Sequence, residues 1–259
     1  MGGLTIAYER VGRGPALILL HGGLSDHREW RAQLDGLSDT RTVIAWDAPG
    51  CGGSDDPPET FRMPDYARTL AGFIEAVGAE APAVLGLSWG STLALELYRL
   101  RPGVPRVLIL AAAYAGWAGS LPPDVVDKRL RDALRDLATS PEALAQSFLP
   151  TLFTERASDE MRDGILRVMT EMRPAGARPM LHALAEADLR DVLPTIEVPT
   201  LLLYGAEDAR SPLPIAEAMH AAIPTSSLVV LPDVGHQSNI ETPGLFNDAV
   251  RAFLDARST

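Results

Sequence analysis

The chain has 259 residues, of which 46% are hydrophobic and 22% charged, as in folded globular proteins rather than disordered or fibrous ones. Its formal net charge of −11 repels polyanions, so we do not expect a nucleic-acid partner. Cys51 is the only cysteine, which excludes an intramolecular disulfide, and the longest apolar stretch, residues 107–119, is too short to span a bilayer.

Two short apolar strands are predicted at the start of the chain, at residues 4–10 and 16–20. The connection between them contains Gly12 and Gly14 and is short enough to favour a hairpin over a crossover. We therefore predict that these two strands pair with each other and that the sheet begins antiparallel.

Strands then alternate with helices. Apolar runs at residues 42–46, 83–87 and 106–111 are predicted strands, and residues 65–77 and 88–101, between them, have helical spacing. This alternation is typical of a mostly parallel sheet whose strands are joined by crossover helices.

A motif with chemical meaning stands where one of these strands meets its helix. It reads Gly86-Leu87-Ser88-Trp89-Gly90. A G-x-S-x-G sequence in that context holds its serine on a strained turn with the hydroxyl exposed, at a helix N-terminus that favours negative charge. We predict that Ser88 is a nucleophile; the alternative role for such a residue is a helix N-cap.

The strand pattern stops between about residues 115 and 198. Helical spacing recurs there, at residues 125–137 and 165–172, and no convincing strand appears. A helical insertion in an array of strands and helices predicts a cap over the edge of the sheet. The alternative is an ordinary run of packing helices.

Two further strands, at residues 200–204 and 228–231, complete the predicted sheet, and each is followed by an ionisable group. A serine hydroxyl becomes a nucleophile when a base takes its proton and an acid orients that base. His236 follows the last strand and is the predicted base. Glu207 and Asp208 follow the strand before it, and both are candidate acids because side-chain direction cannot be read from the sequence.

Acyl transfer also needs N–H donors for the developing oxyanion. One predicted donor is the backbone N–H of Trp89, the residue after the nucleophile. The other is expected in the loop His21-Gly22-Gly23-Leu24, where glycine allows the backbone to approach a ligand closely. We assign Gly23, with Leu24 as the alternative.

Together these motifs resemble the α/β-hydrolase superfamily along nearly the whole chain. The resemblance rests on five landmarks in order: His21-Gly22-Gly23, residues 47–55, the Gly86 to Gly90 turn, residues 205–208 and Gly235-His236. It implies the α/β-hydrolase fold and Asp208, rather than Glu207, as the acid.

Within the superfamily, residues 24–30 and 236–243 are most similar to the 3-oxoadipate enol-lactonase and carboxylesterase branch. Haloalkane dehalogenases and epoxide hydrolases carry aspartate where this chain has Ser88, so both are excluded. The loop continues Leu24-Ser25-Asp26 and lacks the Pro-Gly pair of proline iminopeptidases and carbon-carbon bond hydrolases, which makes both less favoured.

We therefore predict an α/β-hydrolase core at residues 1–114 and 199–259, with a helical cap at residues 115–198 inserted before the last two strands. The predicted reaction is hydrolysis of a carboxylic ester or lactone of a small organic molecule through an acyl-enzyme, without a metal or other cofactor. Candidate pocket residues, each of which could instead fill the core of the cap, are Tyr114, Trp117, Phe148, Phe153 and His182.

Other functions stay open at this level. An acyltransferase or a carbon-carbon bond hydrolase would use the same triad, and a ligand-binding protein on this fold could retain it with little turnover. The N-terminus lacks the basic and apolar regions of a signal peptide, so we expect a cytoplasmic protein without a membrane partner. The sequence does not set the oligomeric state.

Overall fold

The structure is a computed structural model that describes residues 3–257. Its seven-stranded sheet has the order β1-β3-β2-β4-β5-β6-β7, and β1 is antiparallel to β3 while the other neighbouring pairs are parallel. The strands are β1 Tyr8–Val11, β2 Ala16–Leu20, β3 Thr42–Trp46, β4 Ala83–Leu87, β5 Val107–Ala111, β6 Thr200–Gly205 and β7 Ser226–Leu231.

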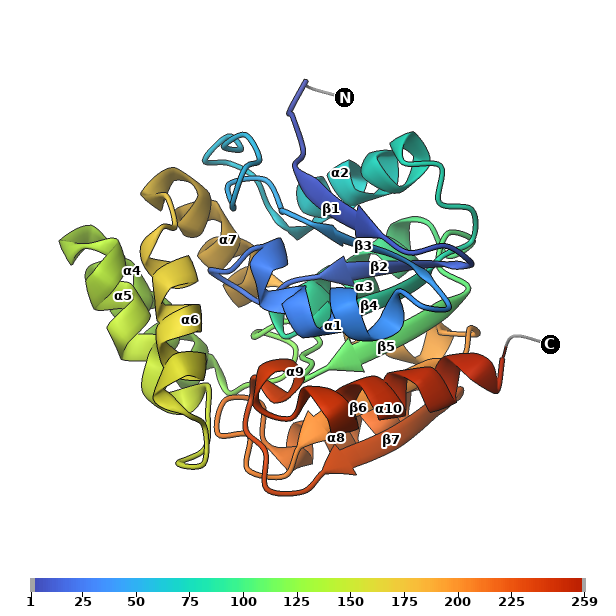
Figure 1. Cartoon of the computed structure of the whole chain (residues 1–259). Helices are drawn as coiled ribbons and strands as arrows, with labels where there is room; N and C mark the ends of the chain where they lie inside the picture. The colour runs from blue at the N-terminus through green and yellow to red at the C-terminus, as the bar shows by residue number, and fades with distance from the viewer. Residues whose placement is uncertain (1–2, 258–259) are drawn as a thin grey trace.

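Helices cover both faces of the sheet, which explains why its central strands are continuous apolar runs. Alternate residues of each strand pack on opposite faces: Ile18 lies in the core with α2, α3 and α8, and Leu17 lies in the core with α1 and α10. Figure 1 shows α1 and α10 together on one face. These helices are α1 Arg31–Leu37, α2 Met63–Ala76, α3 Trp89–Leu100, α8 Leu213–Ala222 and α10 Pro243–Asp255.

The predicted hairpin is wrong. β1 pairs with β3, and β2 lies on the other side of β3. The connection after β1 crosses the start of β3, where Thr42 donates its N–H to the carbonyl of Pro15 at 3.2 Å and its hydroxyl to the carbonyl of Gly14 at 2.9 Å. The antiparallel start is present, but its partner strand lies farther along the chain.

The strand predicted at residues 4–10 begins only at Tyr8. The residues before it bond to the loop after β3 instead of to a strand. Ala7 accepts a hydrogen bond from the N–H of Asp47 at 2.8 Å, and Thr5 accepts one from the N–H of Asp55 at 3.0 Å. This segment therefore helps to fix the loop that leaves β3.

Four helices between β5 and β6 form the cap: α4 Pro123–Thr139, α5 Pro141–Phe148, α6 Asp159–Thr170 and α7 Pro174–Glu186. Figure 1 shows them beyond the carboxyl ends of the parallel strands. None of the helices within residues 3–257 is long and apolar enough to cross a membrane. The remaining short helices are η1 His27–Trp30, η2 Leu149–Thr151, η3 Leu193–Thr195 and α9 Ser238–Glu241.

The start of α7 is fastened to the core. Its N-cap residue, Arg173, bonds the carbonyls of Gly52 at 2.8 Å and Ser54 at 2.6 Å. Nearby, a Cβ added to Gly176 would collide with the backbone of Gly50. Backbone thus packs directly on backbone, and only glycine fits at this contact.

Candidate active site

The turn between β4 and α3 has the geometry that the G-x-S-x-G sequence predicts. Ser88 sits there with φ +52° and ψ −110°, a conformation that residues other than glycine rarely adopt. A Cβ on Gly86 would collide with Gly90, and a Cβ on Gly90 would collide with the carbonyl of Leu20. The flanking glycines are therefore required for the turn to close.

The acid and the base are hydrogen-bonded to each other. Nδ1 of His236 lies 2.8 Å from Oδ2 of Asp208 and 3.0 Å from Oδ1, and both side chains are buried. Oδ1 of Asp208 also accepts the N–H groups of Arg210 and Ser211, each at 2.8 Å. A carboxylate acceptor places the proton of the neutral imidazole on Nδ1, which leaves Nε2 free to accept a proton.

The competing carboxylate is directed elsewhere. Glu207 is exposed and forms an ion pair with Arg156 at 2.8 Å. Of the two acids that the sequence left open, the structure brings Asp208, and not Glu207, to His236.

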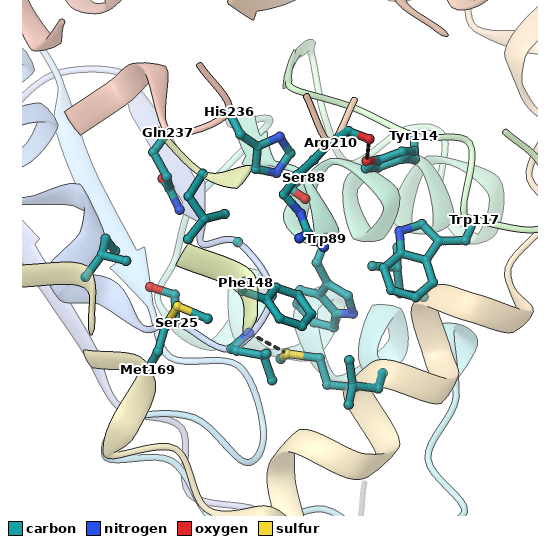
Figure 2. A pocket seen from close by; sticks show the side chains of 18 residues that line it. Ser25, Ser88, Trp89, Tyr114, Trp117, Phe148, Met169, Arg210, His236 and Gln237 are labelled. Atoms are coloured by element: carbon teal, nitrogen blue, oxygen red, sulfur yellow. Dashed lines mark hydrogen bonds between the residues drawn. The ribbon is translucent and has the colours of Figure 1, made fainter. Parts of the chain in front are cut away.

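Ser88 and His236 face one pocket between the sheet and the cap (Figure 2). Its free volume is about 30 Å³, room for only a few water molecules. The cap supplies most of the apolar wall, through Trp117, Phe148, Leu152, Ile165, Met169, Met180, Leu181 and Leu184. A ligand that enters so narrow a site has to be small or to displace these side chains.

The two predicted oxyanion donors lie next to each other. A Cβ added to Gly23 would stand 3.6 Å from the Cβ of Trp89. Within residues 3–257, neither backbone N–H has a protein acceptor. The N–H of Leu24 is instead 3.3 Å from the sulfur of Met180 and is already engaged. Of the two candidates in this loop, Gly23 therefore has the donor available to a ligand.

A buried carboxylic acid that the sequence did not single out holds this loop from behind. Glu29 is 4% exposed, and its two carboxyl oxygens accept the N–H of Gly22 at 3.2 and 3.4 Å. Burial raises the pKa of Glu29 from 4.5 to about 7. Its only sequence signal is its place beside Trp30 shortly after the His-Gly-Gly loop.

The raised pKa of Glu29 predicts a specific loss of stability with rising pH. The unfolded chain releases this proton near pH 4.5 and the folded chain near pH 7, so the free energy of unfolding falls as pH rises between these values. The loss is about 3 kcal/mol at most. We expect Glu29→Gln to remove this step, measured as the difference between the urea-unfolding free energies of the two proteins at pH 5 and at pH 7.5. Equal pH slopes would contradict the assignment.

Of the candidate pocket residues, Tyr114, Trp117 and Phe148 line the pocket. Phe153 and His182 are outside its lining. Phe153 packs beneath the guanidinium of Arg162, 5.8 Å from the ring centre, and His182 lies 3.0 Å from Glu186 on α7. Helical spacing indicates that a residue belongs to the cap, but not whether it points toward the sheet.

Asp26, His27 and Asp47 are the one group in residues 3–257 whose donor atoms are close enough together to hold a metal ion. Asp26 already receives three hydrogen bonds from the side chain of Arg28. Asp47 lies 2.7 Å from Nδ1 of His27 and accepts the N–H of Gly53 at 2.8 Å. These oxygens are thus engaged by internal donors.

Comparison with known proteins places the chain in a family. Residues 17–249 match the sequence profile of the alpha/beta hydrolase family. The chain belongs to this family. The predicted superfamily and fold class are thereby confirmed, and this alpha/beta hydrolase has esterases and a lactonase among its relatives.

Three of the similar proteins are two esterases and one lactonase. A pimeloyl-[acyl-carrier protein] methyl ester esterase of Aeromonas hydrophila is 30% identical over 97% of this chain and 100% of its own. A thermophilic esterase from Thermogutta terrifontis, solved with malate bound, is 32% identical with a TM-score of 0.92, covering 99% and 95% of the two chains. An enol-lactonase from Burkholderia xenovorans LB400 is 25% identical with a TM-score of 0.88, covering 98% of each.

Proposed function

We propose that this hydrolase cleaves a carboxylic ester or lactone of a small organic molecule through an acyl-enzyme on Ser88. The observation that carries the proposal is the buried hydrogen bond between His236 and Asp208 in the pocket that also holds Ser88 on its strained turn. The esterase and enol-lactonase names of its relatives favour ester chemistry.

In the proposed reaction the oxygen of Ser88 attacks the substrate carbonyl while Nε2 of His236 takes the hydroxyl proton. Asp208 keeps the proton of Nδ1 in place and stabilises the imidazolium. The N–H groups of Gly23 and Trp89 bind the oxyanion. His236 then gives its proton to the leaving alkoxide, and a water molecule, activated by the same imidazole, releases the acid and restores the serine.

We propose that residues 115–198 act as the cap that selects substrates. Most of the apolar wall around Ser88 comes from these residues, so changes here should alter the preferred acyl or alcohol length more than the chemical step. The boundaries at residues 115 and 198 follow the last core strand before the cap and the first one after it.

Covalent trapping tests this function. We expect a fluorophosphonate to add one phosphonyl group per chain, mapped to Ser88 by peptide mass spectrometry, and to stop hydrolysis of 4-nitrophenyl esters in proportion. A panel of esters and lactones of graded acyl length then sets the substrate range, and product analysis with a competing alcohol separates hydrolysis from acyl transfer. Labelling at another residue, or hydrolysis that persists after full labelling, would refute the acyl-enzyme.

A further inference from the structure

One arginine side chain, that of Arg210, lies in the wall of the pocket, and its backbone belongs to the loop that carries Asp208. Arg210 lies two residues after Asp208 and lines the pocket with Ser88 and His236. Its N–H bonds Oδ1 of Asp208 at 2.8 Å, and its carbonyl accepts the hydroxyl of Tyr114. The backbone that carries this side chain is therefore held on both sides.

The side chain of Arg210 is held as well. Its guanidinium carbon stands 4.2 Å from the ring centre of Phe148, and Nη1 donates to the hydroxyl of Thr151 at 2.9 Å. Figure 2 shows the side chain extending from beside Tyr114 into the pocket, toward Phe148. Stacking on an aromatic ring is a favourable position for a guanidinium, and it orients the planar group.

This guanidinium has no carboxylate partner. No ion pair of 4.0 Å or less involves Arg210 within residues 3–257, and the nearby carboxylate of Asp208 is engaged by His236. Arg173 of the cap, by contrast, is paired with Asp56 at 2.7 Å. A guanidinium has five N–H donors, and among the described residues only Thr151 offers this one a side-chain acceptor. Arg210 is half-buried, and charges that are removed from water are normally paired.

A second arginine adds to the positive potential. Arg129 of α4 bonds the carbonyl of Arg210 at 3.3 Å, and it also forms no ion pair within the described residues. Both arginines line a neighbouring cavity of about 280 Å³, which shares Trp117 and Phe148 with the active-site pocket. The acids of that cavity, Asp132 and Asp136, are each 2.9 Å from Arg135, and Asp132 also pairs with Lys128, so two cations balance the two acids.

We propose that Arg210 binds a carboxylate of the substrate, so that the preferred substrates are monoesters or lactones bearing a carboxylate group rather than neutral esters. This inference rests on the proposed function, since it names the substrate class of the same site. A guanidinium binds carboxylate through paired, charge-assisted hydrogen bonds. Arg129 makes the approach to the pocket more positive in a chain of net charge −11 and so favours entry of an anion.

The kinetic test compares two esters of equal acyl length, 4-nitrophenyl hydrogen glutarate and 4-nitrophenyl pentanoate. We expect the wild type to have the higher kcat/KM for the glutarate monoester. The ratio of the two kcat/KM values should fall roughly 10- to 100-fold in Arg210→Met, which loses the charge but keeps an unbranched side chain against Phe148. Arg210→Lys should give an intermediate ratio, because lysine keeps the charge without the fork.

Arg257→Met is the matched control. Arg257 also stacks on a phenylalanine, 3.6 Å from the ring centre of Phe253, but it lies after α10 and does not line the pocket. The substitution makes the same change in net charge, so an unchanged ratio in this variant separates a local contact from the overall field. A ratio that falls equally in both variants would overturn the role of Arg210.

A binding measurement decides the inference without turnover. We expect calorimetry to show that glutarate binds the wild type at least tenfold more tightly than Arg210→Met, with circular dichroism and thermal melting confirming that each variant is folded. If Arg210→Met does not fold, Arg210→Lys and Arg210→Gln replace it.

Unchanged glutarate affinity in a folded variant overturns the inference. Activity that depends on Ser88 but shows no preference for the anionic ester also overturns it while leaving the proposed function intact. If glutarate binding depends on Arg210 but ester hydrolysis does not depend on Ser88, the acyl-enzyme is refuted and the role of Arg210 stands.

Discussion

Ser88→Ala is expected to lower kcat for ester hydrolysis by about a million-fold, the loss seen when the serine of a comparable triad is removed. The substitution deletes the oxygen that, in the proposed mechanism, forms the acyl bond. Alanine has to adopt the same positive φ as the serine it replaces, so the strain of the turn is unchanged and we expect the thermal midpoint to stay within a few degrees. Stopped-flow and long-time assays of one aryl ester cover the necessary range of rates.

The control is Ser147→Ala in α5, because the hydroxyl of Ser147 bonds, among residues 3–257, only the carbonyl of Leu144, at 2.8 Å. This variant should hydrolyse the same ester at the wild-type rate and still take up one fluorophosphonate. Near-normal activity in a purified, folded Ser88→Ala protein would rule out the proposed serine mechanism.

Asp208→Asn should reduce kcat by about ten thousand-fold, as the same change does in a comparable triad. The two backbone N–H groups of Arg210 and Ser211 that now bond Oδ1 would keep the amide oxygen of asparagine. The amide NH₂ would then face Nδ1 of His236 and move the imidazole proton to Nε2, where it blocks proton transfer from Ser88. The fold should be preserved because the shape of the side chain is the same.

Glu207→Gln is the matched control for this effect. It removes the adjacent carboxylate, whose partner is the exposed Arg156, and should leave kcat within a factor of about two, since exposed ion pairs contribute little. Comparable losses in Asp208→Asn and Glu207→Gln would show that the acid had been assigned to the wrong residue.

Apolar pattern alone located the central strands well. The predicted ranges 42–46 and 83–87 coincide with β3 and β4, because strands buried on both faces must be apolar throughout. The order of neighbouring strands was harder to predict from the sequence. A short connection predicted that the first two strands pair, but the hydrogen bonds of Thr42 to the connection place β3 between them.

The candidate site shows the same division. Ser88 and the position of His236 follow from local context, because a turn and the end of a strand are set by nearby residues. No local pattern pointed to Arg210. The position of its guanidinium depends on Phe148 and Thr151, which approach it only in the folded chain. Phe153 and His182 were candidates for the pocket wall because both belong to the cap, yet their side chains contact other cap residues.

The fastening of α7 to the core limits how a bulky molecule can enter. Arg173 and the contact between Gly176 and Gly50 anchor the first turn of α7, so this end of the helix cannot serve as a hinge. Passage to the buried serine must therefore depend on movement elsewhere in the cap, where Phe148 ends α5 and Met169 lies on α6. The loop before α6 is also attached to the core, because Glu241 accepts the N–H of Thr154 at 3.1 Å. We therefore expect access to the serine to depend on the side chains of Phe148 and Met169 rather than on a free end of the cap.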